Sequence, residues 1–254
     1  MVCTLDKNRV STIRKALKAL GKKNFVFIMH NGSFPAAEGE NTGFGTINSN
    51  GGKKFLNYAQ GLFDAIQMGP AGKTKSSDSS PYTGTIFSNN PLFIDLKELT
   101  TDKWFKILSE KTFNDIVENN PNKDKNRTSY TYITKRQDEA LTEAFNNFEK
   151  LNNKELNKEF EAYKKENDSW LSKDSLYEAL SIKNGTDFWP NWKDKTDKNL
   201  FNPKTKEEEK AFAKRIEETS KTYAKEIEKY KFIQFVLNKQ NLETKKLADS
   251  KGIK

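Results

Sequence analysis

The stretch SSDSSPYTGTIFSNNPLFIDL, residues 76–96, places one aromatic residue, Tyr82, among small hydroxyl and amide side chains. Ser80 precedes it, and Gly84 follows where the backbone must turn tightly. An aromatic ring offers a flat apolar face and neighbouring hydroxyls offer hydrogen bonds at its rim, a combination that suits a sugar ring. Loops of this composition are also common as plain surface turns, so the residues alone leave both interpretations open.

Few other side chains could take part in chemistry. His30 is the one histidine of the chain and could line a site or be a satisfied structural residue. Trp189 and Trp192 could stack on a ligand ring, although tryptophans at a corner between helices more often belong to the core. Asp78 and Asp95 resemble a carboxylate pair, but Asp95 fits the N-cap of the helix that follows it, and Asp78 fits a solvated loop.

The composition is that of a folded chain with a basic surface. The 254 residues suffice for one large domain or two small ones, and the formal net charge is +9. The lysines alternate with acids, as in EEEKAFAKRIEETSKTYAKEIEKYK at 207–231, which is the usual surface of a helix in water. There is no arginine cluster and no nucleic-acid motif, so we expect no nucleic-acid partner; a basic helical nucleic-acid binder is kept as the least favoured hypothesis.

The start of the chain and its cysteine content indicate a cellular compartment. Cys3 is the one cysteine, so no internal disulfide can form. MVCTLDKNRV is polar and does not resemble a signal peptide, and no apolar stretch approaches the about 20 residues of a membrane span. We therefore expect a cytoplasmic protein with no membrane contact.

The first third of the chain predicts a βαβ unit. Helical spacing begins at Asp6 and ends at Gly21. The apolar runs 24–30 and 63–70 predict two short strands, each covered on both faces, and 53–62 predicts the helix between them. Strands joined in this way should be parallel.

The rest of the chain is predicted to be almost entirely helical. The expected helices are 96–110, 135–152, 154–167, 172–181 and 204–248, the last with one break. The final LADSKGIK has a glycine at a capping position and then Ile-Lys, which is how a third strand would begin in an α/β protein. A complete α/β barrel needs eight strands and about 250 residues, so the chain is either an unusual α+β protein or the N-terminal part of a longer one.

Several motifs, in order, resemble the N-terminal part of the 4-α-glucanotransferases, also called amylomaltases or disproportionating enzymes. They are HNGSFP at 30–35, FDAIQMGPAG at 63–72, SSPYTGTIFSNNPLFIDL at 79–96, ENDSWLSKDSLYEAL at 166–180, YKFIQFVLNKQ at 230–240 and LADSKGIK at 247–254. Two features depart from the family pattern: Thr83 stands where a glutamine is usual, and the loop AAEGENTGFGTINSN keeps only Gly43-Phe44-Gly45 of its usual character.

The resemblance implies an α/β fold, the first part of a (β/α)8 TIM barrel with two parallel strands and a large, mostly helical insertion. Residues 1–100 would be the start of the barrel with a substrate loop. Residues 101–254 would be a helical insertion that leads to a missing third barrel strand. The barrel would be incomplete in this chain.

The resemblance also implies a chemistry, the transfer of α-1,4-glucan segments between maltodextrins by a retaining double displacement. Such a reaction needs two carboxyls, a nucleophile and an acid/base, and no cofactor or metal. The family's Asp-His, His-Asp and Glu-Asp-Leu-Gly elements are absent from this sequence, whose one histidine is His30. We therefore expect no catalytic residue in this chain, which would be inactive alone and would need a missing C-terminal half.

By the same resemblance, three residues would contact substrate. Tyr82 would be a stacking platform, Ser80 a hydroxyl partner for sugar oxygens, and His30 part of the active-site floor. The expected partners are α-1,4-glucans or maltodextrins. The alternative is a non-catalytic maltodextrin-binding or interaction module.

Overall fold

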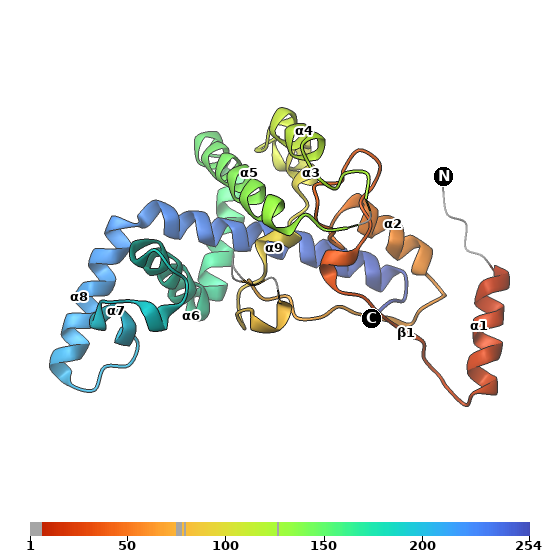
Figure 1. Cartoon of the computed structure of the whole chain (residues 1–254), viewed down its shortest axis with the longest axis horizontal. Coiled ribbons are helices and arrows are strands. Elements are labelled where there is room, and N and C mark those ends of the chain that lie inside the picture. The colour runs from red at the N-terminus through yellow and green to blue at the C-terminus, as the bar shows by residue number, and fades with distance from the viewer. Residues whose placement is uncertain (1–6, 75–77, 79, 126) are drawn as a thin grey trace. The chain divides into compact units, whose positions relative to one another are not determined.

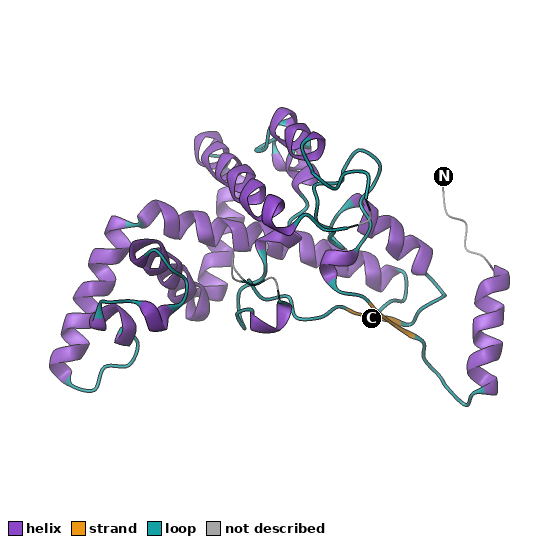
Figure 2. Cartoon of the chain, viewed as in Figure 1, coloured by secondary structure: helices purple, strands orange, loops and turns teal. Residues whose placement is uncertain are grey.

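The computed structural model describes residues 7–74, 78, 80–125 and 127–254. The chain folds as two compact units. Unit 1 comprises residues 1–151 and 236–254, and unit 2 comprises residues 152–235. Helices predominate, and the named strands of the described residues form one small sheet in unit 1 (Figures 1 and 2). No helix in the described parts of the chain is both long enough and apolar enough to cross a membrane.

The predicted βαβ unit is confirmed. Strand β1 (Val26–Ile28) pairs in parallel with β2 (Ala65–Gln67), and Phe27 lies opposite Ile66. The connection carries α2 (Asn50–Ala59), whose N-cap Ser49 accepts a hydrogen bond from the Gly52 amide. The helix α1 (Lys7–Ala19) precedes the sheet and buries none of its side chains; Asp6, where we expected it to begin, lies outside the described residues.

The prediction that both strands are covered on both faces is wrong. Val26 and Ile28 are 45% and 73% exposed, whereas the Phe27 ring between them contacts the rings of Phe55 and Phe63. Side chains alternate along a strand, so the packed face takes only every second residue. On β1, Phe27 therefore packs into the core on one face of the sheet, whereas Val26 and Ile28 are exposed on the other face.

The end of the chain lies alongside β2. Helix α9 (Ala224–Ser250) ends at a turn in which Gly252 has φ +71°, a left-handed conformation that favours glycine. The Lys254 amide then donates to the Asp64 carbonyl, and the Ile66 amide donates to the Lys254 carbonyl, each at 3.0 Å. Because the Asp64 amide bonds Phe25 on the side of β1, Lys254 occupies the opposite edge of β2. This pairing agrees with the expectation that LADSKGIK leads into a strand.

The stretch 96–110 is not the single helix that we predicted. It contains α3 (Leu96–Leu99) and the 3-10 turn η4 (Asp102–Trp104), and α4 (Glu110–Glu118) follows. The Thr100 and Thr101 hydroxyls bond backbone carbonyls three residues earlier, which gives the chain an alternative to continued helix. The expected packing still holds, since Leu99, Trp104 and Leu108 are all buried.

The helical core of unit 1 lies around α3, η4, α5 (Tyr130–Leu151) and the C-terminal half of α9. Asp95 caps α3 as predicted, by accepting from the Lys97 amide. Gln240 of α9 holds the Asp95 backbone at both its amide and its carbonyl, at 2.8 and 3.1 Å. The side chains buried most completely here include Leu99, Trp104, Ile107, Leu108, Ile116, Ile133, Leu141 and Phe145.

Unit 2 is helical. Residues 154–184 form one helix, α6 (Lys154–Asn184), in place of the two predicted for that stretch. The break expected within 204–248 is confirmed, because α8 (Lys206–Thr222) and α9 are separated at Tyr223. The turn η5 (Trp189–Asn191) and α7 (Lys195–Asn199) complete its elements. The core side chains are Leu176, Ala179, Leu180, Trp192, Leu200, Phe212 and Ile227.

The two corner tryptophans have different environments. Trp192 is 3% exposed and donates through Nε1 to the Thr186 carbonyl, so it is a core residue. Trp189 is 52% exposed.

Candidate functional site

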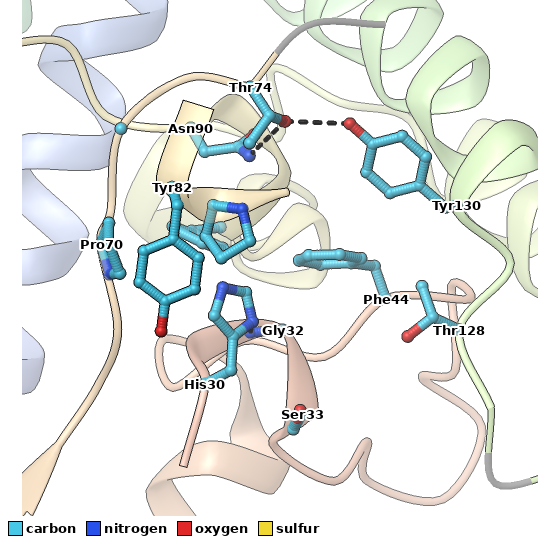
Figure 3. Close-up of a pocket in the computed structure, with 13 residues that line it drawn as sticks. His30, Gly32, Ser33, Phe44, Pro70, Thr74, Tyr82, Asn90, Thr128 and Tyr130 are labelled. Carbon is cyan, nitrogen blue, oxygen red and sulfur yellow. Dashed lines mark hydrogen bonds between the residues drawn. The ribbon is translucent and has the colours of Figure 1, made fainter. Parts of the chain in front are cut away.

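A hollow of about 410 Å³ lies in unit 1, beyond the C-terminal ends of the two strands. Three segments form it: the loop after β1, the loop after β2 and the residues around the start of α5 (Figure 3). Its lining residues are His30, Gly32, Ser33, Phe44, Pro70, Gly72, Thr74, Pro81, Tyr82, Asn90, Phe93, Thr128 and Tyr130.

His30 is held by the turn that follows β1. It is the N-cap of η1 (Asn31–Ser33), and its Nδ1 accepts a hydrogen bond from the Gly32 amide at 3.1 Å. Burial lowers the pKa of His30 below its ordinary value, which favours the neutral ring. With Nδ1 accepting, the proton resides on Nε2, which is buried and has no hydrogen-bond partner among the described residues. His30 therefore carries an unused donor at the hollow.

Phe44 forms an aromatic wall of the hollow. Its ring stacks on Phe93 with a centroid distance of 5.9 Å, and a Cβ on Gly32 would lie 2.5 Å from the ring. The flanking glycines are required, because Gly43 has φ +97° and a Cβ on Gly45 would lie 2.0 Å from the Phe34 carbonyl oxygen.

The loop after β2 presents Tyr82. Residues on its two sides pair across it, with the Lys73 amide donating to Ser88 and the Thr85 amide donating to Lys73. Tyr82 lies in the turn η2 (Pro81–Thr83) and is 83% exposed. The loop thus holds an aromatic ring at the hollow without burying it (Figure 3).

A hydrogen-bonded network ties this loop to α5. The Asn90 side-chain amide donates to Thr74 Oγ1 at 3.1 Å, and Thr74 Oγ1 lies 2.9 Å from the Tyr130 hydroxyl (Figure 3). Asn90 Oδ1 also accepts from the Leu92 amide, where η3 (Pro91–Phe93) begins. The network joins Thr74 and Asn90, which lie on either side of Tyr82 in the sequence, to Tyr130 of α5.

The structure brings two of the three predicted contact residues together. His30 and Tyr82 line the same hollow, whereas Ser80 is not among its lining residues. Ser80 precedes η2, and its amide donates to Asp78 Oδ1. Asp78 also accepts from the Thr83 hydroxyl, so it organises the loop and is not merely solvated as we expected. Residues 75–77 and 79 of the serine-rich stretch lie outside the described residues.

The sequence and the fold of this chain are similar to those of known proteins. A family model described as 4-alpha-glucanotransferase matches residues 30–254. The chain belongs to the 4-alpha-glucanotransferase family. A 4-alpha-glucanotransferase of Clostridium butyricum is 31% identical over 129 residues, which are 50% of this chain and 24% of that protein.

Among solved structures, the amylomaltase of Streptococcus agalactiae in complex with acarbose is similar in fold. It superposes with a TM-score of 0.72 at 20% sequence identity, over 91% of this chain and 42% of that one. The chain thus spans about a quarter of the length of the first relative and less than half of the second.

The hollow of this family member lacks the groups that would break a glycosidic bond. None of its described lining residues is Asp or Glu. Asp95 is engaged as a helix cap and is 6% exposed. Within the described residues, no three His, Cys, Asp or Glu side chains come close enough together to hold a metal ion.

Sequence reasoning missed part of the hollow. The sequence marked Phe44 only by its place between two glycines, and no sequence pattern pointed to Asn90, Thr74 or Tyr130. Their roles depend on loops far apart in sequence meeting at one place; Thr74 and Tyr130 are 56 residues apart. The Gly-Phe-Gly motif was the one local signal, because paired glycines around an aromatic indicate a constrained backbone.

Proposed function

We propose that this chain supplies the glucan-contacting part of a 4-α-glucanotransferase active site. The observation that carries the proposal is that Tyr82 and His30 line one hollow, at the strand ends, in a member of this family. The fold similarity to an amylomaltase that binds acarbose supports it. The substrates would be α-1,4-glucans, such as maltodextrins.

The chemistry of the lining suits a sugar. The exposed Tyr82 ring and the Phe44 ring offer apolar faces for the C–H face of a glucose unit. The His30 ring lies in the wall of the hollow and adds another ring to its lining. The Ser33 and Thr128 hydroxyls add polar groups at the rim.

For the whole protein we propose a retaining transfer. One carboxylate would attack the anomeric carbon while a second carboxyl protonates the leaving oxygen, and a sugar hydroxyl would then displace the enzyme. The hollow described here would bind and orient glucan, and the two carboxyls would come from elsewhere, since no described lining residue is Asp or Glu.

The two parallel strands would be the first two of a (β/α)8 barrel, with the Lys254 backbone at the position of a third. In that scheme residues 1–100 begin the barrel and 101–254 form the helical insertion. A cytoplasmic location is part of the same proposal, and the single cysteine supports it.

A titration tests glucan binding. Maltotetraose is added to the purified 254-residue chain, and heat or amide chemical shifts are measured, with cellotetraose as the matched β-linked control. We expect saturable binding of maltotetraose that Tyr82→Ala weakens about tenfold, as loss of a stacking aromatic does at a binding site. Equal responses to the α- and β-linked sugars, or no response at millimolar maltotetraose, would refute the proposal.

The second candidate is a maltodextrin-binding module without catalysis, which a lining without Asp or Glu among its described residues favours. Turnover in a mixture with the rest of an enzyme distinguishes the two. Both ideas predict that the chain alone releases no glucose from maltotriose. Catalysis that appears when the remainder of a relative's sequence is added in trans supports the transferase, and binding with no catalysis in that mixture supports the module.

A further inference from the structure

A second hollow of about 580 Å³ adjoins the first in unit 1. The two share Gly32, Ser33, Phe44 and Thr128 as lining residues. These shared residues form a wall between the two hollows, and Figure 3 labels Phe44, Ser33 and Thr128 on the side of the first. The second hollow therefore lies directly beside the proposed glucan site.

The second hollow is basic. Lys123, Lys125 and Arg127 line it, and Glu38 is the one acidic side chain among its described lining residues. The structure gives none of the three cations an ion pair with a described residue, although this chain forms such pairs at many other sites. Asp124 lies between two of them in sequence but does not line the hollow. Three cationic residues and one acidic residue thus line the hollow.

The basic segment is held in place by the loop after β1. The Asn41 side-chain amide donates to the Lys123 carbonyl at 3.1 Å, and the Asn120 side-chain amide donates to the Asn41 carbonyl at 3.1 Å. The Ser129 amide donates to the Gly43 carbonyl at 2.7 Å. These bonds attach the chain on both sides of the three basic residues to the loop after β1.

We propose that the second hollow binds a phosphate monoester carried by a sugar. A phosphate ester has three strong acceptor oxygens and close to two negative charges near neutral pH, and clusters of lysine and arginine are its usual protein partners. The hydroxyls of Ser33 and Thr128 on the shared wall would donate to the bridging sugar or to the ester. The ligand would be a glucose unit phosphorylated at a primary hydroxyl, with its ring at the first hollow. This inference rests on the proposed glucan binding.

The test compares maltose with maltose phosphorylated at a primary hydroxyl, titrated into the full chain, with inorganic phosphate as a third probe. The phosphorylated sugar should bind at least about tenfold more tightly than maltose, as one charge-assisted hydrogen bond provides. Inorganic phosphate that binds as tightly as the phosphorylated sugar would show that the sugar makes no contribution and would overturn the proposal.

The test variant combines Lys123→Gln, Lys125→Gln and Arg127→Gln. The matched control combines Lys15→Gln, Lys18→Gln and Lys22→Gln, which removes the same charge from exposed residues near the N-terminus of the same unit. The test variant should abolish the preference for the phosphorylated sugar, whereas the control should keep it. Equal loss in both would assign the preference to net charge and overturn the proposal.

Maltose binding itself separates this inference from the proposed function. If maltose and its phosphorylated form bind equally well, the glucan site stands and the phosphate site is wrong. If maltose shows no binding and longer maltodextrins also fail, the proposed function is wrong, and the sugar-phosphate inference fails with it.

Discussion

The helical core and the sheet of unit 1 are both rich in apolar residues, yet they differ sharply in burial. Leu99, of helix α3, is fully buried, whereas Ile28, the last residue of β1, is 73% exposed. In the core, the Gln240 side chain of α9 bonds both the amide and the carbonyl of Asp95, which precedes α3. The sheet is packed on one face only, around Phe27.

The difference shows which parts of unit 1 hold the site in place. The hollow lies at the ends of two partly exposed strands, but hydrogen bonds outside the sheet hold its loops. Asn90 and Thr74 link the loop after β2 to Tyr130 of α5, and Ser129 bonds the loop after β1. The helical core therefore positions the site as much as the strands do.

The largest expected effect is in the core. Leu99→Ala removes a fully buried side chain and should lower the free energy of unfolding by about 2–5 kcal/mol. Ile28→Ala, its matched control on the open face of the sheet, should change it by less than about 0.5 kcal/mol. Urea unfolding of both variants measures this, and similar losses would show that the sheet is as tightly packed as the core.

Asp95 should make the core sensitive to pH. Burial raises the pKa of Asp95 from its ordinary 3.8 to about 7, with Lys53 opposing that rise. An acid whose folded-state pKa is raised contributes stability that is fully present below its unfolded pKa and is lost as pH rises through the folded value. Unfolding free energy should therefore fall between about pH 4 and about pH 7 on account of this group.

Asp95→Asn keeps a good N-cap side chain and removes the titration. The variant should gain at least about 1 kcal/mol over the native chain at about pH 8 and lose most of this advantage near pH 4. Asp102→Asn, which changes an exposed carboxylate of the neighbouring turn, serves as the control. A constant difference between the D95N and native curves across this range would contradict the raised pKa.

The hydrogen bond between Tyr130 of α5 and Thr74 of the loop after β2 should contribute less to stability than the core side chains do. Tyr130→Phe removes the hydroxyl that bonds Thr74 and should lower stability by about 1 kcal/mol and weaken maltotetraose binding a few-fold. Tyr58→Phe, at a partly exposed tyrosine on α2, should change neither quantity appreciably. An unchanged affinity in Tyr130→Phe would mean that the network does not position the loop.

The smallest effect on stability belongs to Tyr82. Its side chain is 83% exposed, so Tyr82→Ala should alter the free energy of unfolding by less than about 0.5 kcal/mol. The same variant loses about tenfold in glucan affinity if the ring is a sugar platform. Thermal melts alongside the binding titration separate the two, and a large drop in melting temperature would make Tyr82 a structural residue.

Sequence patterns predicted the parts of the fold that depend on local or periodic signals. The parallel βαβ unit and the cap at Asp95 follow from apolar spacing and capping chemistry, whereas the break expected within 204–248 could not be placed at Tyr223 in advance. The division of 96–110 was missed because the threonines bond the backbone locally, and the open face of β1 was missed because an apolar run does not reveal what covers it.

The site was predictable only where a motif marked it. His30 and Tyr82 lie in stretches that resemble the family's own, and they do line one hollow. Tyr130 belongs to the site because its hydroxyl bonds Thr74, 56 residues earlier in the sequence. No local sequence pattern predicts such a contact.

The most direct measurement is a crystal structure of the chain with maltotetraose. The account predicts a glucose ring stacked on Tyr82 and lying in the hollow that His30 lines. Sugar bound at another surface, with the hollow between His30 and Tyr82 free of it, would contradict the account.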